Sequence, residues 1–445
     1  MVHYNYFCIN ENYKINVGNI NLIVLLCKIN KLKYTQMPQS FINKFYFVLF
    51  VVALIFGVII YDIIGFDFTD EICALFLIIL FISYMFNTDN WRINKAFLIA
   101  IFIFIFYLCY SFHIKSNTTT GILTDFFIQI KPYLAFFCVY SMLPNFSINK
   151  KAILKSIVLI FWFLLLIIGI GDVFIHNFIA KVMGHWSYFA AAVTMTSLCY
   201  LYCSKFSTLD KITFLLMLSI GLLSGRSKFY GFFAFSTLIL FFFNNVKDYK
   251  LSYRNVIVAL FLLIAVVFVA RDKMILYFYE SATEDINNDM LARYVLYANC
   301  PEVLKDYFPF GSGLATYATH ASGVHYSHIY VDYEIDNVWG MTKDNYSFIS
   351  DTYYPSLAQF GVAGILLFIL FWIYILRKAF LFSKVVNNTH SLTLIVLITG
   401  YLAIECTTDA MFTANRGFFL LMMLGMILGN IKEDYYKQIE NPKAQ

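Results

Sequence analysis

Residues 291–340, LARYVLYANCPEVLKDYFPFGSGLATYATHASGVHYSHIYVDYEIDNVWG, belong to a long polar segment in a mostly apolar chain. The whole segment runs from about residue 271 to 353 and holds five Lys or Arg residues, twelve Asp or Glu residues and three of the eight histidines. Loops longer than about 12–15 residues are usually functional or disordered, and the many aromatic side chains argue against a disordered linker. We therefore expect any chemistry in this segment, at the surface of a membrane.

The rest of the chain is too apolar for a soluble domain. It is 60% hydrophobic and 13% charged, whereas a soluble domain has roughly 25% charged residues. A transmembrane helix needs about 20 mostly apolar residues. The sequence therefore predicts an all-α polytopic membrane protein with about 12 transmembrane helices. The expected spans are residues 43–61, 71–86, 96–112, 122–143, 152–171, 187–203, 210–224, 228–243, 254–270, 354–376, 391–410 and 416–430.

The long polar segment lies between the ninth and tenth expected spans. We expect one membrane domain, residues 41–445, that includes this segment, residues 271–353, as a large loop. Residues 1–40 are polar and rich in Asn, and we expect them to form a cytoplasmic N-terminal extension. Met37 is an alternative start of the protein.

The distribution of Lys and Arg predicts the orientation. Cytoplasmic loops of membrane proteins carry an excess of these residues. With the N-terminus inside, the inner segments carry 21 of them and the outer segments carry ten, five of which lie in the long loop. We therefore expect both termini in the cytoplasm and the long loop outside. The net charge of +5 is small and does not suggest a nucleic-acid partner.

Several cations stand where this orientation signal does not favour them. Arg226 and Lys228 lie in a very short outer turn, Arg416 lies at the outer start of the last span, and Arg293 lies in the long loop. A planar guanidinium binds phosphate oxygens in bidentate fashion, so a lipid-linked phosphate is one explanation. Interfacial cations that extend towards water are the other. Lys131, in the fourth expected span, is costly there unless it faces a polar cavity.

Four short motifs follow one another along the C-terminal two-thirds of the chain. They are SGRSKF at 224–229, PFGSG at 309–313 after Arg293, YSHIY at 326–330, and SDTYYPSLAQFGVAG at 350–364. In this order, on about twelve spans with one large loop, they resemble the O-antigen polymerase and ligase superfamily of bacterial envelope glycosyltransferases. The resemblance implies a multi-pass protein of the bacterial inner membrane whose long loop is periplasmic.

One departure from the family favours the polymerase branch. Ligases of this superfamily carry His-Asn-x-Tyr at the start of the tenth span, and the histidine is their proposed base. When the sequences are aligned on Gly361, Ser350 stands at the position of that histidine and Asp351 at that of the asparagine. Because other histidines lie nearby in the loop, the ligase stays open as an alternative.

The resemblance implies transfer of a glycan from undecaprenyl pyrophosphate to a sugar hydroxyl of an incoming repeat unit. The departing pyrophosphate needs fixed positive charge, and we expect Arg226 and Arg293, with Arg416, to supply it. The hydroxyl needs a base, for which Asp351 is the first candidate. His328 and Glu334 are the second candidates for the base, and a helix N-cap is the alternative role of Asp351.

Further residues are candidates for substrate binding because they combine flat aromatic faces or charges with a place near the expected site. They are Lys228, Tyr326, His328, Tyr330, Glu334, Tyr353 and, beside the phosphate, Arg416. Aromatic residues also anchor helices at the bilayer interface, and this is the alternative for Tyr353. Gly311 and Gly313 are expected to allow a turn that a side chain would block.

We expect no metal and no cofactor. The spacing of His320, His325 and His328 matches no standard zinc site, and the acids at 332, 334 and 336 fit a solvated face better than a divalent-ion site. No P-loop pattern is present. The expected partners are undecaprenyl-pyrophosphate-linked glycans, membrane lipid and a polysaccharide chain-length regulator. Besides the ligase, a lipid-linked oligosaccharide flippase or other transporter remains an alternative, although the sequence shows no internal repeat.

Overall fold

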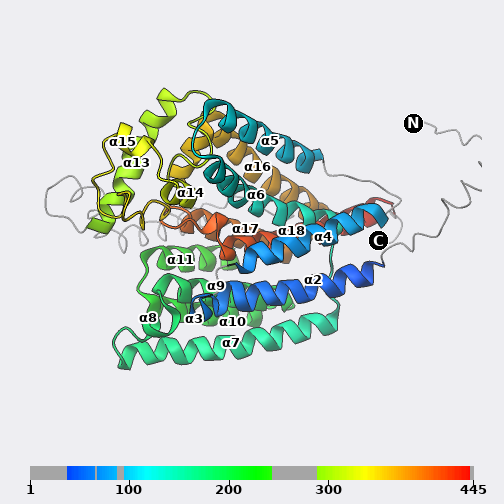
Figure 1. Cartoon of the computed structure of the whole chain (residues 1–445). Coiled ribbons are helices and arrows are strands. Elements are labelled where there is room, and N and C mark those ends of the chain that lie inside the picture. Colours follow the sequence, from blue (N-terminus) through cyan, green and yellow to red (C-terminus); the bar gives the residue numbers. More distant parts are fainter. Residues whose placement is uncertain (1–37, 66–67, 88–94, 243–287, 441–445) are drawn as a thin grey trace, which may run out of the picture.

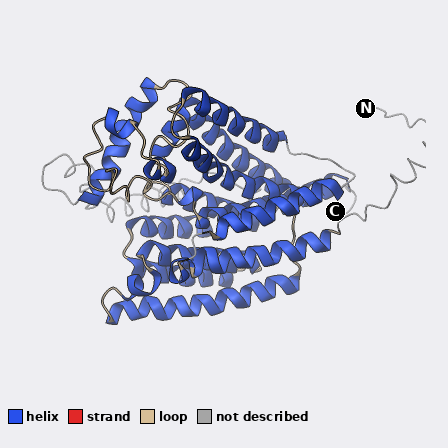
Figure 2. Ribbon diagram, viewed as in Figure 1, coloured by secondary structure: helices blue, strands red, loops and turns tan. Residues whose placement is uncertain are grey.

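The computed structural model describes residues 38–65, 68–87, 95–242 and 288–440, and this part of the chain holds helices and no strands (Figures 1 and 2). Six of its helical segments are long and apolar enough to cross a membrane. They are α2 with η1 (Gln39–Leu54, Ile55–Ile59), α4 (Thr69–Asn87), α5 (Lys95–Ile114), α6 (Thr119–Met142), α7 (Ile148–Phe174) and η4 with α16 (Pro355–Phe360, Gly361–Val386).

Among the described residues, shorter or less apolar helices occupy five of the six remaining expected spans. They are α9 (Trp186–Cys203), α10 with η2 (Thr208–Ser219, Ile220–Ser224), α11 (Ser227–Phe242), α17 (Thr389–Glu405) and α18 (Asn415–Glu440). Short helices α3 (Tyr61–Ile64), α8 (Phe178–Met183) and η5 (Met411–Thr413) connect some of them. The expected span 254–270 and nearly all of the N-terminal extension lie outside the described residues. The all-helical, multi-pass character is thus confirmed, whereas the number of twelve stays a prediction.

Two helices, α16 and α18, end ten residues beyond the ends that the apolar runs predict. The sequence placed the end of the tenth span at residue 376 and that of the twelfth at 430, but α16 continues to Val386 and α18 to Glu440. Helix α16 continues because its buried side chains, Ile375, Ala379 and Phe382, recur every three or four residues past the expected end at residue 376. Such spacing keeps side chains on one helix face, so packing extends the helix into a polar sequence.

Helix α18 lies inside the bundle and α7 on its outside. Residues Phe418–Leu428 of α18 are buried, and a side chain at Gly425 would lie only 2.6 Å from the Phe136 carbonyl of α6. This close approach requires glycine. On α7, by contrast, Ile160, Phe163 and Ile167 are exposed. An apolar outer surface is what a bilayer-embedded bundle presents to lipid.

The described part of the long loop, residues 288–353, folds into a small unit that we call the cap. It contains α13 (Asn288–Asp306), α14 (His320–Val324) and α15 (Ile329–Asp332), and it lies at the end of the bundle opposite the beginning of α2 (Figure 1). The cap has its own hydrophobic core, which includes Leu296, Tyr317 and Met341. Because the cap has this core, the described part of the loop is a folded unit and not a simple linker, as expected. Its side of the membrane stays a prediction.

Polar contacts dock the cap on α6 and on the preceding turn. The buried carboxylate of Asp125 in α6 accepts a hydrogen bond from the Ala315 N–H at 2.8 Å. The Asn117 side chain donates to the carbonyls of Ala315 and His325, at 2.6 and 2.8 Å. Buried polar groups are stabilising only when they are hydrogen-bonded, so these contacts fix the cap on the helices.

The expected glycine turn meets the start of α16. Gly311 and Gly361 both have positive φ angles, +81° and +63°, and a Cβ on Gly361 would lie 2.3 Å from the Gly311 nitrogen. Backbone packs directly on backbone here, which no other residue pair allows.

We expect Gly361→Ala to destabilise the protein by about 2–5 kcal/mol, because backbone strain adds to overpacking. Thermal unfolding in detergent measures this. Gly65→Ala is the matched control: Gly65 has φ +64°, but no atom lies within 4 Å of its added Cβ. Equal losses in the two variants would contradict the backbone contact as the cause.

Candidate functional site

A cavity of about 1840 Å³ opens between the cap and the helix ends. Residues of α4, α6, α9, α11, α13, α17 and α18 line it, together with the segment 350–356. Nine charged side chains face it: Asp70, Glu71, Lys131, Arg226, Lys228, Arg293, Asp351, Asp409 and Arg416. Because such a concentration of charge is costly inside a membrane bundle, this cavity is the candidate functional site.

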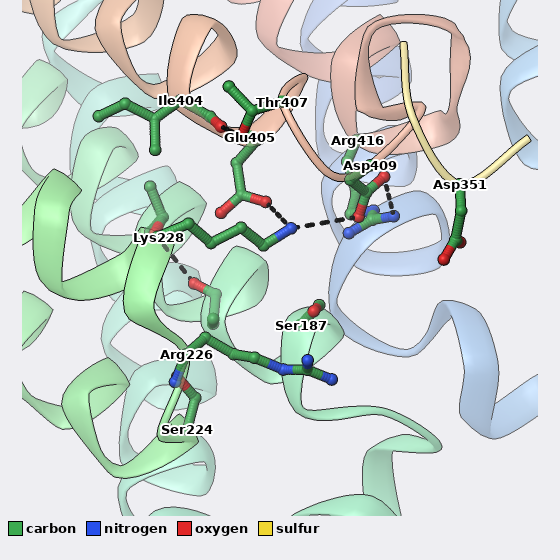
Figure 3. A network of polar contacts seen from close by, with 12 residues as sticks. Ser187, Ser224, Arg226, Lys228, Asp351, Ile404, Glu405, Thr407, Asp409 and Arg416 are labelled. Carbon is green, nitrogen blue, oxygen red and sulfur yellow. Dashed lines mark hydrogen bonds and ion pairs between the residues drawn. The ribbon is translucent and has the colours of Figure 1, made fainter. Parts of the chain in front are cut away.

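One wall of the cavity carries a linked set of charges from α11, α17 and α18 (Figure 3). Lys228 Nζ lies 2.6 Å from Glu405 Oε2 and 3.7 Å from Asp409 Oδ2. Arg416 Nη2 lies 3.2 Å from the other oxygen of Asp409, and the Arg416 guanidinium lies over the Tyr188 ring at 4.8 Å. Asp409 therefore bridges two cations. We call these four charged residues and Arg226 the cationic wall.

The cations govern the ionisation of Asp409. Burial by itself would raise the pKa of this carboxyl group, but Arg416 and Lys228 hold the pKa below its usual range. Asp409 is thus a fixed negative charge that keeps both cations in place. Among the described residues, Arg416 Nη1 is buried without a hydrogen-bond partner, so its donor capacity is not fully used.

Arg226 begins the turn into α11. Gly225, with φ +64°, ends η2 and turns the chain so that the next side chain points towards α9. The Arg226 guanidinium lies beside the His185 ring, and its Nη2 is 2.5 Å from His185 Nε2. The guanidinium carbon of Arg226 also lies 5.8 Å from the centre of the Trp186 ring. Burial, with the positive charge of Arg226, lowers the pKa of His185 to about 4. His185 is therefore neutral at pH 7.

This shift predicts a pH dependence of stability. Between about pH 6.5, the ordinary pKa of His, and its folded value of about 4, the unfolded chain binds a proton that the folded chain does not. Stability must therefore fall on acidification through this range. We expect His185→Gln to lose less thermal stability than the wild type between these pH values, and parallel curves for the two proteins would contradict the assignment.

On the cap side, Arg293 of α13 binds Asp351. The Arg293 Nε lies 3.1 Å from Asp351 Oδ2, and Nη2 forms an ion pair with the same oxygen. Burial raises the pKa of the Asp351 carboxyl group, while Arg293 partly offsets the rise. The Asp351 side chain stays 34% exposed, so a ligand in the cavity can reach it.

On α4 and α6, Lys131 forms ion pairs with Asp70 and with Glu71, the latter at 2.7 Å from Nζ to Oε1. Lys131 thus faces a polar cavity and has acidic partners, as its place within a span requires. The Asp70 backbone N–H also donates to Asn415 Oδ1 at 2.8 Å. This bond ties the start of α4 to the start of α18, next to Arg416.

The structure brings six of the ten predicted site residues to one cavity. They are Arg226, Lys228, Arg293, Asp351, Tyr353 and Arg416. Tyr353 is buried and contacts the Phe412 ring at 4.9 Å. Tyr353 thus joins the cavity lining to the packed aromatic side chains behind it.

The other four predicted residues do not line this cavity. Tyr330 is buried in the cap core, where its hydroxyl accepts from the Ala318 N–H and bonds Ser322. The Tyr326 hydroxyl donates to the Met341 carbonyl at 2.6 Å. His328 is exposed, 3.8 Å from Asp332. Glu334 lines a smaller surface hollow of about 570 Å³. Tyr326 and Tyr330 thus form hydrogen bonds within the cap, and a part for them in substrate binding stays a prediction.

Several cavity residues were not among the predicted ones. They are His185, Trp186, Tyr188, Asp70, Glu71, Asp409 and, behind Lys228, Glu405. The sequence gives a signal for Glu405, which lies within the expected span 391–410, where an ionisable side chain is costly unless it is paired. Asp70, Glu71 and Asp409 lie at the ends of expected spans, where carboxylates are common, and give no such signal. His185 is the N-cap of α9 and Trp186 is the first residue of this helix, and neither gives a signal in the sequence.

No family model and no curated protein matches this chain. The chemistry of the cavity therefore carries the functional argument.

Proposed function

We propose that this protein is a surface-polysaccharide polymerase of the O-antigen type. It joins undecaprenyl-pyrophosphate-linked oligosaccharide repeat units at the periplasmic face of a bacterial inner membrane. The observation that supports this best is one cavity that gathers the cationic wall and, facing it, a carboxyl group of raised pKa. A reaction with an anionic leaving group and a hydroxyl nucleophile needs these two elements.

The cationic wall suits a pyrophosphate leaving group. Breaking the bond between the anomeric carbon and the pyrophosphate oxygen leaves negative charge on the pyrophosphate. Donors that are fixed in place before the reaction stabilise such charge without reorganisation. Arg226 and Arg416 supply planar guanidinium groups, and Lys228 supplies an ammonium group. Asp409 holds Lys228 and Arg416 in position.

Asp351 suits the role of base. The acceptor hydroxyl attacks the anomeric carbon, a new carbon–oxygen bond forms, and the hydroxyl proton passes to the Asp351 carboxylate. A base works best when its pKa is close to the working pH, and burial moves the pKa of Asp351 in that direction. Arg293, which the sequence suggested as a phosphate ligand, orients this carboxylate in our proposal.

The products are a lengthened glycan on one lipid and a free undecaprenyl pyrophosphate. No nucleotide is needed, since the donor is already activated. Partners in this proposal are the lipid-linked glycans, membrane lipid and a chain-length regulator, and both termini lie in the cytoplasm. A ligase that transfers glycan to lipid A-core uses the same donor and is the nearest alternative.

A transporter is the second candidate, and one observation favours it. Buried ion pairs cross between helices at Lys131 with Asp70 and at Lys228 with Glu405. Charged pairs of this kind occur in transporters that move ions or charged substrates. Asp351 lines the same cavity, and a buried carboxyl group of raised pKa in a cavity is a candidate general base. We therefore favour catalysis over transport.

Deletion of the gene, followed by gel separation of the surface glycan by length, separates the candidates. Loss of a polymerase leaves core capped by a single repeat unit. Loss of a ligase leaves bare core with glycan on the lipid carrier, and loss of a flippase leaves single units inside the cell. Either of the last two patterns would overturn the proposal.

A further inference from the structure

The Lys131 ion-pair cluster forms a part of the cavity to which the proposed reaction assigns no role. Asp70 is buried, with only 4% of its side chain exposed, whereas 47% of the Glu71 side chain is exposed. Both residues and Lys131 face the cavity, together with Gln129. Asp70 thus anchors the lysine, the lysine holds Glu71 in place, and Glu71 presents its carboxyl group to a ligand.

This cluster differs in sign from the cationic wall. It holds two carboxyl groups for one ammonium group, whereas the cationic wall holds three cations for two carboxylates. A phosphate is repelled by a carboxylate and attracted by guanidinium groups. The cavity therefore suits a ligand with an anionic group at one end and hydrogen-bond donors at the other.

The Lys131 cluster and the cationic wall lie close together in the fold. Asn415, whose side chain binds the Asp70 backbone, directly precedes Arg416 in α18. A carboxylate accepts strong, charge-assisted hydrogen bonds from hydroxyl or amino groups. A saccharide joined to a pyrophosphate has both kinds of group at the required ends.

We propose that Glu71, held by Lys131 and Asp70, forms a saccharide subsite that binds hydroxyl or amino groups of the repeat unit. This inference rests on the proposed function, because it takes the ligand to be a lipid-linked glycan. The subsite contributes binding, while Asp351 and the cationic wall carry out the reaction.

Isothermal titration calorimetry on the purified protein in nanodiscs tests the subsite. The probes are the repeat-unit oligosaccharide released from the host polysaccharide, which lacks lipid and phosphate, and inorganic pyrophosphate. We expect Glu71→Gln to weaken oligosaccharide binding about 10- to 100-fold, the effect of a charge-assisted hydrogen bond, and to leave pyrophosphate binding undiminished. Equal oligosaccharide affinity in the variant and the wild type overturns the subsite.

Two further variants provide a control and an alternative to Glu71→Gln. Glu433→Gln is the matched control, because Glu433 also forms a 2.6 Å ion pair with a lysine, Lys437, but outside the cavity. It should change neither affinity. Glu71→Ala removes the carboxyl group without placing an amide beside Lys131, and serves if Glu71→Gln lowers the yield of folded protein; it should weaken oligosaccharide binding to a similar extent, and unchanged affinity would overturn the subsite. Oligosaccharide binding without elongation of lipid-linked units would overturn the proposed function but not the subsite.

Discussion

Asp351→Asn is expected to lower the rate of glycan polymerisation by about 10²–10⁴-fold, the usual contribution of a general base. The amide has nearly the shape of the carboxyl group but cannot take the proton of the attacking hydroxyl. The measurement is the length distribution of the surface glycan in cells that carry only the variant. We expect core capped by single repeat units.

Two comparisons make this prediction specific. Asp344→Asn changes an exposed carboxylate of the same cap that does not line the cavity, and it should leave the glycan at full length. Immunoblots must show both variants at wild-type abundance in the membrane. Full-length chains in the Asp351 variant would show that the base lies elsewhere.

Arg226→Ala is expected to reduce polymerisation by about 10²–10³-fold, the cost of removing one fixed donor from a site of developing negative charge. Arg226→Lys keeps the charge but loses the planar fork, so we expect an intermediate rate. The rate of release of undecaprenyl pyrophosphate from a lipid-linked repeat unit measures both effects directly.

Arg377→Ala serves as the control for Arg226. Arg377 is an exposed arginine of α16 that does not line the cavity, so its loss tests for a general effect of removing surface charge. Normal release by the Arg226 variant at normal abundance would contradict the role of the cationic wall in holding the leaving group.

The long apolar runs predicted most of the helices well. The run expected at 96–112, for example, is α5, Lys95–Ile114, because a continuous apolar stretch of this length has few alternatives to a helix in a bilayer. The end of α16 could not be found in this way. It depends on which face of a polar sequence packs on neighbouring helices.

The candidate site was predictable where a charge stood in an unfavourable place. Arg226 and Arg416 were noticed because cations are disfavoured at the outer ends of spans, and both line the cavity. Tyr330 and Tyr353 were both predicted to bind substrate, yet Tyr330 lies in the cap core and Tyr353 lines the cavity. Helix rotation and loop folding decide this difference, and neither can be read from residue type.

Partners of the cations were missed for a related reason. Glu405 and Asp409 follow Lys228 far along the chain, and they meet it only because α11 packs against α17. A single sequence shows that a buried charge needs a partner, but it does not say which one. The net charge of each part of the cavity can therefore be read only from the folded structure.

The most direct test of the account is to incubate the purified protein with lipid-linked repeat units in nanodiscs. The account predicts glycans that lengthen by whole repeat units, with one undecaprenyl pyrophosphate released for each bond formed, without nucleotide, and no products with Asp351→Asn. Lipid-linked units that stay single, in a preparation that binds them, would contradict it.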